Sequence, residues 1–492
     1  MKMKKLYSIL FIAGMLSFSA CNTDFLDRGP SDQLTEDILL SSTAGGKMLL
    51  NGTIRRTYLG TSIYASQGQF GQKSVDIMTE MLGEDYFTWD GYWGYYEDWY
   101  AWQVHRMAGA SDNEFVWSYY YDIIDNMNIL LKRVDNLEGE QAERDNLKGQ
   151  AKAFRANSYF KLVQLYAARY RPGEDNSQPG IPVYTKPTDI GKARSSVEDV
   201  YKQINADLDS AMLLLTPERE HISHINLNVA QAFKAEVLLT MGKFGEAANM
   251  AHQARSGYAL MDQPAFKSGF NSVSNVEWMW GVAIKTDQAT IYGSYFAHAD
   301  PCSYGYDEMG NEKRINTRLY NTMGEHDVRK AVCYGADGGT RTNQNGTFQL
   351  PPYTVDKFQL PSYSTWAADY CYMRAAEMYL IEAEGLARSG SEAEAADVLF
   401  ELVSQRDPDY TKPIATGQAL IDEILLQRRI ELLGEGFRFF DLKRLNQGLD
   451  RNGKGHDPTF TKPAVVPAGD PGWQFLIPTQ EMNSNPLMKQ ND

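Results

Sequence analysis

Apolar residues recur at helical spacing along most of this 492-residue chain, and the helices that they predict come in pairs. In the segment Asn113 to Leu137, one face of a helix collects Ile123, Met127, Leu130, Leu131 and Val134. The segment 146–170 predicts its partner helix. A further helix is expected at 196–215, where Ser195 or Ser196 can cap the start and Pro217 stops the end. The pattern predicts a mostly α-helical protein.

Two stretches resemble tetratricopeptide (TPR) repeats, Ala230 to Ser256 and Tyr372 to Asp407. Each has a first helix with small residues, a turn centred on glycine, and a second helix that begins near a Glu-Ala-Ala sequence. Alanine and glycine at these positions let two helices approach closely, and neighbouring pairs then stack around a shared core. The expected helix pairs therefore lie near 113–170, 196–256, 372–407 and 417–446.

An irregular stretch from about 262 to 369 separates the two repeats, so a regular solenoid is excluded. Within it, Glu277 to Ile284 reads as a strand, and Trp278 and Trp280 are expected to be partly in the core. A long insertion in a helical scaffold is where binding function usually sits.

The first twenty residues predict a lipoprotein signal peptide. A basic start, MKMKK, precedes a short apolar run that is below the roughly 20 residues needed to span a bilayer. Ser19 and Ala20 then lead to Cys21, the predicted lipidation site, although Phe18 stands where leucine is usual. The alternative is an ordinary secretory signal with a chance cysteine. Residues 21–492 are expected to form a single helical domain.

Charge and cysteine content exclude several classes of protein. The formal net charge is −15, which disfavours a phosphate-binding surface, so no nucleic-acid partner is expected. Cys302, Cys333 and Cys371 have no short spacing and predict free buried thiols, with one disulfide as the alternative.

Aromatic residues are unusually dense at 86–102, YFTWDGYWGYYEDWYAW, where ten of seventeen are aromatic. Flat rings pack on the C–H faces of sugars, while carboxylates accept hydrogen bonds from hydroxyl groups. The alternative is a partly buried cluster that stabilises a loop. The residues predicted here to contact ligand are Asp85, Trp89, Tyr92, Trp93, Tyr95 and Trp99.

A second aromatic group lies in the insertion and comprises Tyr292, Tyr295, Phe296, Tyr304 and Tyr306. Binding and structural roles are equally compatible with its sequence. Tyr292, Tyr295 and Tyr304 are taken as the second set of candidate ligand contacts.

The C-terminal segment RRIELLGEGFRFFD carries charges that could suggest acid–base chemistry, but it is interpreted as a set of structural ion pairs. The charges are Arg429, Glu431, Glu435, Arg438 and Asp441. GLDRNGKG at Gly448 lacks the Ser or Thr of a phosphate-binding loop, and His221 and His224 lack a third metal ligand. No cofactor is expected, and a structural Ca²⁺ is left open.

Several segments, taken in order, are similar to the SusD/RagB family of Bacteroidetes outer-membrane nutrient-binding lipoproteins. They are CNTDFLDRGP, WSYYYDIIDNMNILL, LKGQAKAFRANSYFKLVQLY, GIPVYTKPT, YMRAAEMYLIEAEGLA, LLQRRIELLGEGFRFFDLKRLN and IPTQEMNSNPLMKQN. The resemblance implies a superhelix of about four TPR-type helix pairs with a loop-rich ligand-binding part. It also implies a lipid-anchored protein on the outer-membrane surface that binds glycans, without catalysis, and passes them to a SusC-like TonB-dependent transporter.

Three alternatives remain at this stage. Relatives that serve peptide uptake make a peptide-binding lipoprotein the first of them. The acidic pairs Glu84/Asp85 and Glu97/Asp98 could in principle serve a surface glycoside hydrolase. A TPR scaffold for protein assembly is the third, and the aromatic block argues against it.

Overall fold

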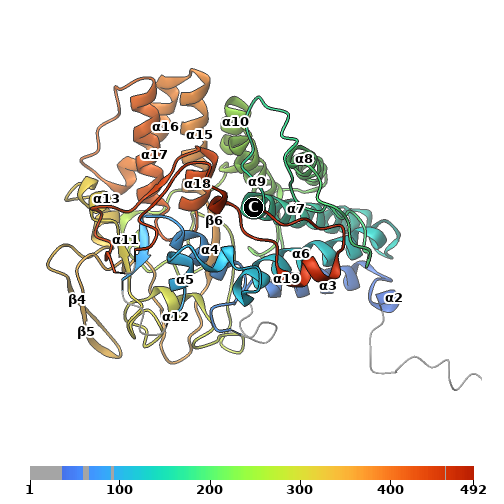
Figure 1. Ribbon diagram of the computed structural model, residues 1–492, viewed down its shortest axis with the longest axis horizontal. Helices are drawn as coiled ribbons and strands as arrows, with labels where there is room; N and C mark the ends of the chain where they lie inside the picture. The colour runs from blue at the N-terminus through green and yellow to red at the C-terminus, as the bar shows by residue number, and fades with distance from the viewer. Residues whose placement is uncertain (1–35, 59–65, 90–93, 460) are drawn as a thin grey trace, which may run out of the picture.

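The computed structural model describes residues 36–58, 66–89, 94–459 and 461–492. Helices dominate it (Figure 1). Two helices precede the aromatic block, α3 (Thr43–Arg56) and α4 (Gln72–Met81), with the short α2 (Glu36–Leu39) before them. The long helices that follow are α6 (Ser111–Arg133), α7 (Gln141–Tyr166), α8 (Val197–Leu214), α9 (Leu227–Thr240), α10 (Phe244–Ala254), α15 (Ala375–Ser389), α16 (Glu392–Arg406) and α17 (Gln418–Glu431).

These long helices stack in chain order, and the stack continues across the insertion. Each helix from α6 to α10 packs on the next, α10 packs on α15, and α15 packs on both α16 and α17. Figure 1 shows α8, α9 and α10 beside α15, α16 and α17, although the insertion separates them in sequence. The predicted mostly α superhelix of TPR-type pairs is confirmed.

Small residues allow the closest helix contacts. A Cβ added at Gly385 of α15 would lie 2.6 Å from the carbonyl oxygen of Phe244, at the start of α10. A Cβ added at Gly149 of α7 would lie 2.7 Å from the side chain of Leu215. Larger residues at these positions would push the helices apart and expose apolar surface.

Helix boundaries follow the capping residues. The hydroxyl of Ser196 accepts a hydrogen bond from the backbone N–H of Asp199 at 3.1 Å and starts α8. The side-chain oxygen of Asn226 accepts a hydrogen bond from the backbone N–H of Val229 at 3.0 Å and starts α9. Gly390, with φ +95°, ends α15 in the left-handed conformation that glycine adopts without strain.

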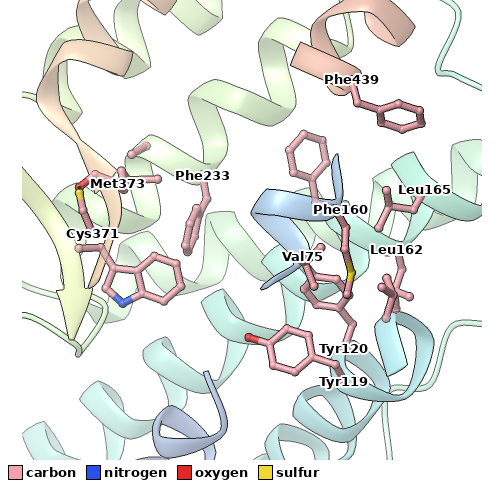
Figure 2. Packing of buried hydrophobic residues seen from close by; sticks show 14 of the residues in the cluster. Val75, Tyr119, Tyr120, Phe160, Leu162, Leu165, Phe233, Cys371, Met373 and Phe439 are labelled. Carbon is pink, nitrogen blue, oxygen red and sulfur yellow. The ribbon is translucent and has the colours of Figure 1, made fainter. Parts of the chain in front are cut away.

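A two-stranded sheet anchors both ends of the insertion in the core. Strand β2 (Trp278–Val282) runs antiparallel to β6 (Tyr370–Arg374), with Trp278 opposite Arg374. Trp278 and Trp280 are buried, and the ring of Trp280 lies 5.4 Å from that of Phe233 in α9. Figure 2 shows Phe233 beside Cys371 and Met373 of β6. The predicted strand and the core position of both tryptophans are confirmed.

The other elements are short, and most of them lie in the segments that connect the long helices. The strands pair antiparallel as β1 (Tyr86–Thr88) with β3 (Lys313–Ile315), β4 (Gly339–Asn343) with β5 (Gly346–Leu350), and β7 (Leu449–Asp450) with β8 (Val465–Val466). The helices are α5 (Glu97–Tyr100), η2 (Val104–Arg106), η3 (Val134–Asn136), α11 (Gln263–Phe266), α12 (Tyr295–Ala299), α13 (Thr317–Thr322), α14 (Val328–Ala331), α18 (Arg438–Arg444), η4 (Pro471–Trp473) and α19 (Thr479–Ser484).

Buried residues form one main core and a smaller one between α15, α16 and α17. Figure 2 shows Val75 of α4 close to Tyr119 and Tyr120 of α6 within the main core. Cys302, Cys333 and Cys371 are buried free thiols, as predicted. No helix among the described residues has the length and apolar character needed to cross a bilayer.

Candidate ligand-binding site

The first aromatic block is divided between the core and the surface. Trp99 is fully buried, with its ring centroid 5.4 Å from that of Phe475 and its indole N–H 3.4 Å from Asp112. Tyr96, Tyr100 and Trp102 are also buried. Trp99 therefore has no free ring face for a ligand, and its prediction as a contact residue is corrected. The C-terminal segment, remote in sequence, covers this ring.

Asp85 is likewise corrected from a ligand contact to a structural residue. Its side chain is buried and lies 2.6 Å from Nη2 of Arg429 and 3.3 Å from Nε of Arg438. Burial alone would raise the pKa of Asp85, but Arg429 and then Arg438 outweigh it and hold that pKa below its ordinary value. The carboxylate is ionised and already satisfied.

Trp89 and Tyr95 keep part of their rings at the surface. The guanidinium carbon of Arg314 lies 4.1 Å from the ring centroid of Trp89, so a cation covers one face of that indole. Tyr92 and Trp93 lie outside the described residues.

The second aromatic group is divided in the same way. Tyr295 begins α12 and is buried, and its hydroxyl donates to the carbonyl of Gly434 at 3.2 Å. Its prediction as a ligand contact is corrected, because packing and this hydrogen bond use the whole side chain. Tyr292 and Tyr304 are 42% and 49% exposed, so both remain accessible.

The surface rings of the two groups meet. The ring centroids of Tyr95 and Tyr306 are 4.3 Å apart, and those of Tyr306 and Tyr292 are 5.6 Å apart. Trp366 joins them, with its ring 6.5 Å from that of Tyr292. These four residues, Tyr95, Tyr292, Tyr306 and Trp366, are called the surface aromatic cluster below. Segments about 200 positions apart in the chain thus build one patch of flat rings.

A buried histidine supports the surface aromatic cluster from below. The ring of His298 stacks on Tyr306, with centroids 5.0 Å apart and planes 19° apart, and it meets Tyr95 edge-on at 5.1 Å. Burial, assisted by Lys313, lowers the pKa of His298 to about 3. The imidazole is therefore neutral at physiological pH and places no charge of its own beneath the rings.

Hydrogen bonds fix the outer edge of the cluster. The hydroxyl of Tyr306 is hydrogen-bonded to the side chain of Gln67, and the side-chain amide of Asn311 donates to the carbonyl of Tyr95 at 2.8 Å. The loop that carries Trp366 is held by Asp300, which accepts from the hydroxyl of Tyr363 at 3.2 Å. Rings positioned in this way lose little conformational freedom when a ligand binds.

Tyr304 lies to one side of the cluster, against the β4–β5 hairpin. Its ring is 5.4 Å from that of Phe348, and its hydroxyl donates to the carbonyl of Asn345 at 3.1 Å. It remains a candidate contact for a ligand longer than the cluster itself.

Several aromatic residues around the site adopt left-handed backbone conformations. Tyr96, Tyr304 and Trp366 have φ values of +65°, +57° and +55°. Such conformations cost bulky residues about 1–3 kcal/mol each and are concentrated at functional sites. Three of the segments that form or flank the cluster therefore carry such a conformation, as do Trp102, Asn176, Phe270, Tyr353 and Asn446 elsewhere in the protein.

Sequence reasoning missed Trp366, and it named Tyr306 in its group without choosing it as a contact. The usable signal for Trp366 was an aromatic pair, Tyr363 and Trp366, in an insertion loop otherwise rich in small residues. The sequence alone could not show that Tyr306 is partly exposed and Tyr295 is buried. That difference arises because α12, which begins at Tyr295, packs against the core.

The charged C-terminal motif forms structural ion pairs, as predicted. Glu431 is buried between Arg374 and Arg406, with contacts of 2.6 and 3.0 Å. Glu435 lies 2.7 Å from Arg374, and Asp441 lies 2.8 Å from Arg428. Arg438 binds Glu84 at 2.6 Å, which also commits the acidic pair Glu84/Asp85 to structure. Across the described ranges, no group of three or more His, Cys, Asp and Glu could hold a metal ion.

Together, the helical superhelix and the loop-borne surface aromatic cluster define a helical scaffold whose loops carry several flat rings at the surface. Two family models match nearly the whole chain. The first, described as starch-binding and associating with the outer membrane, matches residues 24–239, and the second, the SusD family, matches residues 263–492. The chain belongs to the SusD/RagB family.

Individual relatives are distant in sequence but similar over their full length. SusD-like protein P2 of Formosa agariphila is 23% identical over 98% of this chain and 100% of its own. A SusD-like carbohydrate binding protein from Bacteroides vulgatus superposes with a TM-score of 0.79 at 24% identity, covering 91% of this chain and 97% of that one. A laminarin binding SusD-like protein superposes with a TM-score of 0.68 at 19% identity, over 91% and 98% of the two chains. These structural likenesses confirm the fold.

Proposed function

We propose that this protein binds oligosaccharides or polysaccharides through the surface aromatic cluster and delivers them to a SusC-like TonB-dependent transporter, without catalysis. The observation that carries the proposal is the convergence of Tyr95, Tyr292, Tyr306 and Trp366 from separate segments. The description of the matching family as starch-binding and outer-membrane-associated supports it, as do the carbohydrate- and laminarin-binding relatives.

The chemistry of the cluster suits a neutral sugar chain. Flat rings pack on the C–H faces of pyranoses, and the neutral His298 beneath them adds no charge that would select an ionic ligand. Three or four rings at roughly 1 kcal/mol each, with hydrogen bonds at the edge, give an affinity in the micromolar to millimolar range. Affinity of this order lets a carrier both capture and release its ligand.

The predicted signal peptide and the family support a position on the outer-membrane surface. Cys21, outside the described residues, is the proposed attachment site for lipid, which would anchor residues 21–492 as a single domain on the outer-membrane surface. No bound metal or cofactor is proposed. Co-purification of a SusC-like TonB-dependent transporter with the wild-type chain tests the partner.

Two other functions remain as alternatives, a peptide-binding lipoprotein of the same transport type and a surface glycoside hydrolase. Calorimetric titration with starch- and laminarin-derived oligosaccharides, and separately with peptides of similar length, distinguishes sugar from peptide. We expect heat of binding for at least one oligosaccharide and none for the peptides. Release of reducing sugar from those polysaccharides would show an enzyme, and we expect none.

A further inference from the structure

A cavity lies on another part of the protein and shares no residue with the surface aromatic cluster. It has a volume of about 320 Å³ and opens between α6, the extended segment 184–188 and α19. Figure 1 shows α6 and α19 next to each other. Small-molecule sites start at about 300 Å³, so the cavity is large enough for a compact ligand.

Hydrogen bonds between the three segments hold the walls in place. The hydroxyl of Tyr121 on α6 donates to the carbonyl of Pro182 at 2.8 Å, and the side chain of Asn128 donates to the carbonyl of Tyr184 at 2.9 Å. The side chain of Asn485, just after α19, donates to the carbonyl of Lys192 at 2.9 Å. The cavity is therefore formed before any ligand arrives.

Three aromatic rings line the cavity. The rings of Trp117 and Tyr121 on α6 are 4.7 Å apart, and that of Tyr184 meets Tyr121 edge-on at 6.1 Å. Groups that can hydrogen-bond to sugar hydroxyls surround these rings, namely Ser118, Thr188, Gln480 and Ser484. Rings beside such groups suit a saccharide better than a purely apolar ligand.

The charge of the lining is strongly negative. The lining contains four acidic residues and a single basic one. The acidic residues are Glu114, Asp122, Asp125 and Glu481, and the basic residue is Lys186. Asp122 has a cationic partner, Arg56 at 3.0 Å, whereas Glu114, Asp125 and Glu481 have none among the residues that the structure describes. Burial and then the like charge of Glu36 raise the pKa of Asp125. A cation in the cavity would relieve this repulsion.

We propose that this cavity binds an amino sugar, a saccharide that carries a protonated amine. The rings and hydroxyl-binding groups take the sugar, and the carboxylates of Asp125 and Glu481 take the ammonium group. The site is independent of the neutral-glycan site proposed above.

Calorimetric titration of the whole chain with glucosamine, N-acetylglucosamine and glucose tests the proposal. At about pH 6 an amine with a pKa near that of an α-amino group is protonated, while the other two sugars are neutral. We expect glucosamine to bind at least roughly fivefold more tightly than either neutral sugar, because a carboxylate–ammonium pair at an accessible site is worth up to about 1 kcal/mol. The preference should fall as salt is added.

Charge-neutralising variants locate the binding. Asp125→Asn should weaken glucosamine binding about threefold to fivefold, and Asp125→Asn with Glu481→Gln by about tenfold or more. Asp422→Asn, an exposed aspartate of α17 outside the cavity, is the matched control and should change nothing. Melting temperature confirms that each variant is folded.

Equal affinity for the three sugars, or full glucosamine binding in the double variant, would overturn the proposal. Tighter binding of lysine methyl ester than of glucosamine would also overturn it, because the cavity would then recognise a protein side chain. Binding of starch- or laminarin-derived oligosaccharides should be unchanged in the double variant. If the wild-type chain fails to bind these neutral oligosaccharides, the proposal for the surface aromatic cluster is contradicted, and the proposal for the cavity is not affected.

Discussion

Arg429 and Asp85 stand 344 positions apart in the sequence, and two hydrogen bonds of 2.8 and 2.6 Å join the guanidinium to the carboxylate. The pair ties the charged C-terminal motif to the segment that leads into the first aromatic block. Arg438 reinforces the same junction through Glu84. The motif therefore positions the part of the chain that carries Tyr95, without itself touching the surface aromatic cluster.

Arg438→Ala should destabilise the fold and leave ligand affinity intact. Removing this guanidinium leaves the buried carboxylate of Glu84 without its nearest charge partner, and breaking a buried pair costs about 3–5 kcal/mol. A thermal melt should show a clear drop in melting temperature. Lys412→Ala is the control, because its ion pair with Asp397 is exposed and worth at most about 1 kcal/mol. An Arg438→Ala protein of wild-type stability that fails to bind would mean that the motif is a functional site.

Acid should weaken the C-terminal junction through Asp441. Burial alone would raise its pKa, but Arg428 and then Arg444 outweigh it and lower the pKa of Asp441 to about 2. A carboxyl whose pKa is lower in the folded state stabilises the fold above its unfolded pKa of about 4, and this stabilisation is lost as the pH falls towards 2. About two pKa units correspond to roughly 2–3 kcal/mol.

Comparison of the wild type with Asp441→Asn isolates that contribution. The variant should be less stable at pH 7, and the stability difference should shrink as the pH falls from about 5 towards 2, because the carboxyl of the unfolded wild type is protonated first and that of the folded wild type last. Denaturant unfolding at a series of pH values measures it. A difference that stays constant over this range would contradict the ion-pair account.

Trp99 and Tyr292, both predicted from the sequence to contact ligand, should respond to truncation in opposite ways. Trp99→Ala should cost about 3–5 kcal/mol of folding stability, since its ring is fully buried against Phe475. Tyr292→Ala should cost less than about 1 kcal/mol, because its ring is 42% exposed. Parallel urea titrations of the two variants give both values. Near-equal losses would show that burial does not separate core rings from surface rings here.

Lipid attachment can be examined separately from folding. Cys21→Ala should give a soluble protein that no longer partitions into detergent or labels at the cell surface, because the thiol that accepts the lipid is missing. Detergent phase partitioning of wild type and variant measures the difference. Membrane association that persists in the variant would refute lipidation at Cys21.

Helical periodicity was sufficient to predict most of the long helices, while the resemblance to the SusD/RagB family implied their arrangement as a superhelix. The predicted segments near 113–170 and 372–407 each form a pair of helices, and 196–256 forms three helices, because their apolar stripes pack against neighbouring helices. The strand at 277–284 was also recognisable from its run of large apolar residues. The early helices α3 and α4 were not predicted.

Which aromatic rings are exposed could not be predicted from local sequence. Trp99 and Tyr95 are four positions apart in the same dense block, yet the C-terminal segment covers Trp99 and leaves Tyr95 partly exposed. Trp366 joins the cluster only because the loop that carries it folds back beside Tyr292. Both outcomes depend on contacts between segments that are far apart in the chain.

The most direct test of the account is calorimetric titration of starch- and laminarin-derived oligosaccharides into the wild type, Tyr292→Ala, Trp366→Ala and Phe400→Ala. Phe400 is a half-buried ring on α16, outside the cluster, and serves as the matched control. We predict micromolar to millimolar binding of at least one oligosaccharide by the wild type and by Phe400→Ala. Each cluster variant should bind about tenfold to hundredfold more weakly, a loss of about 1–3 kcal/mol. Oligosaccharide binding that is equally strong in all four proteins would contradict the assignment of the surface aromatic cluster as the glycan site.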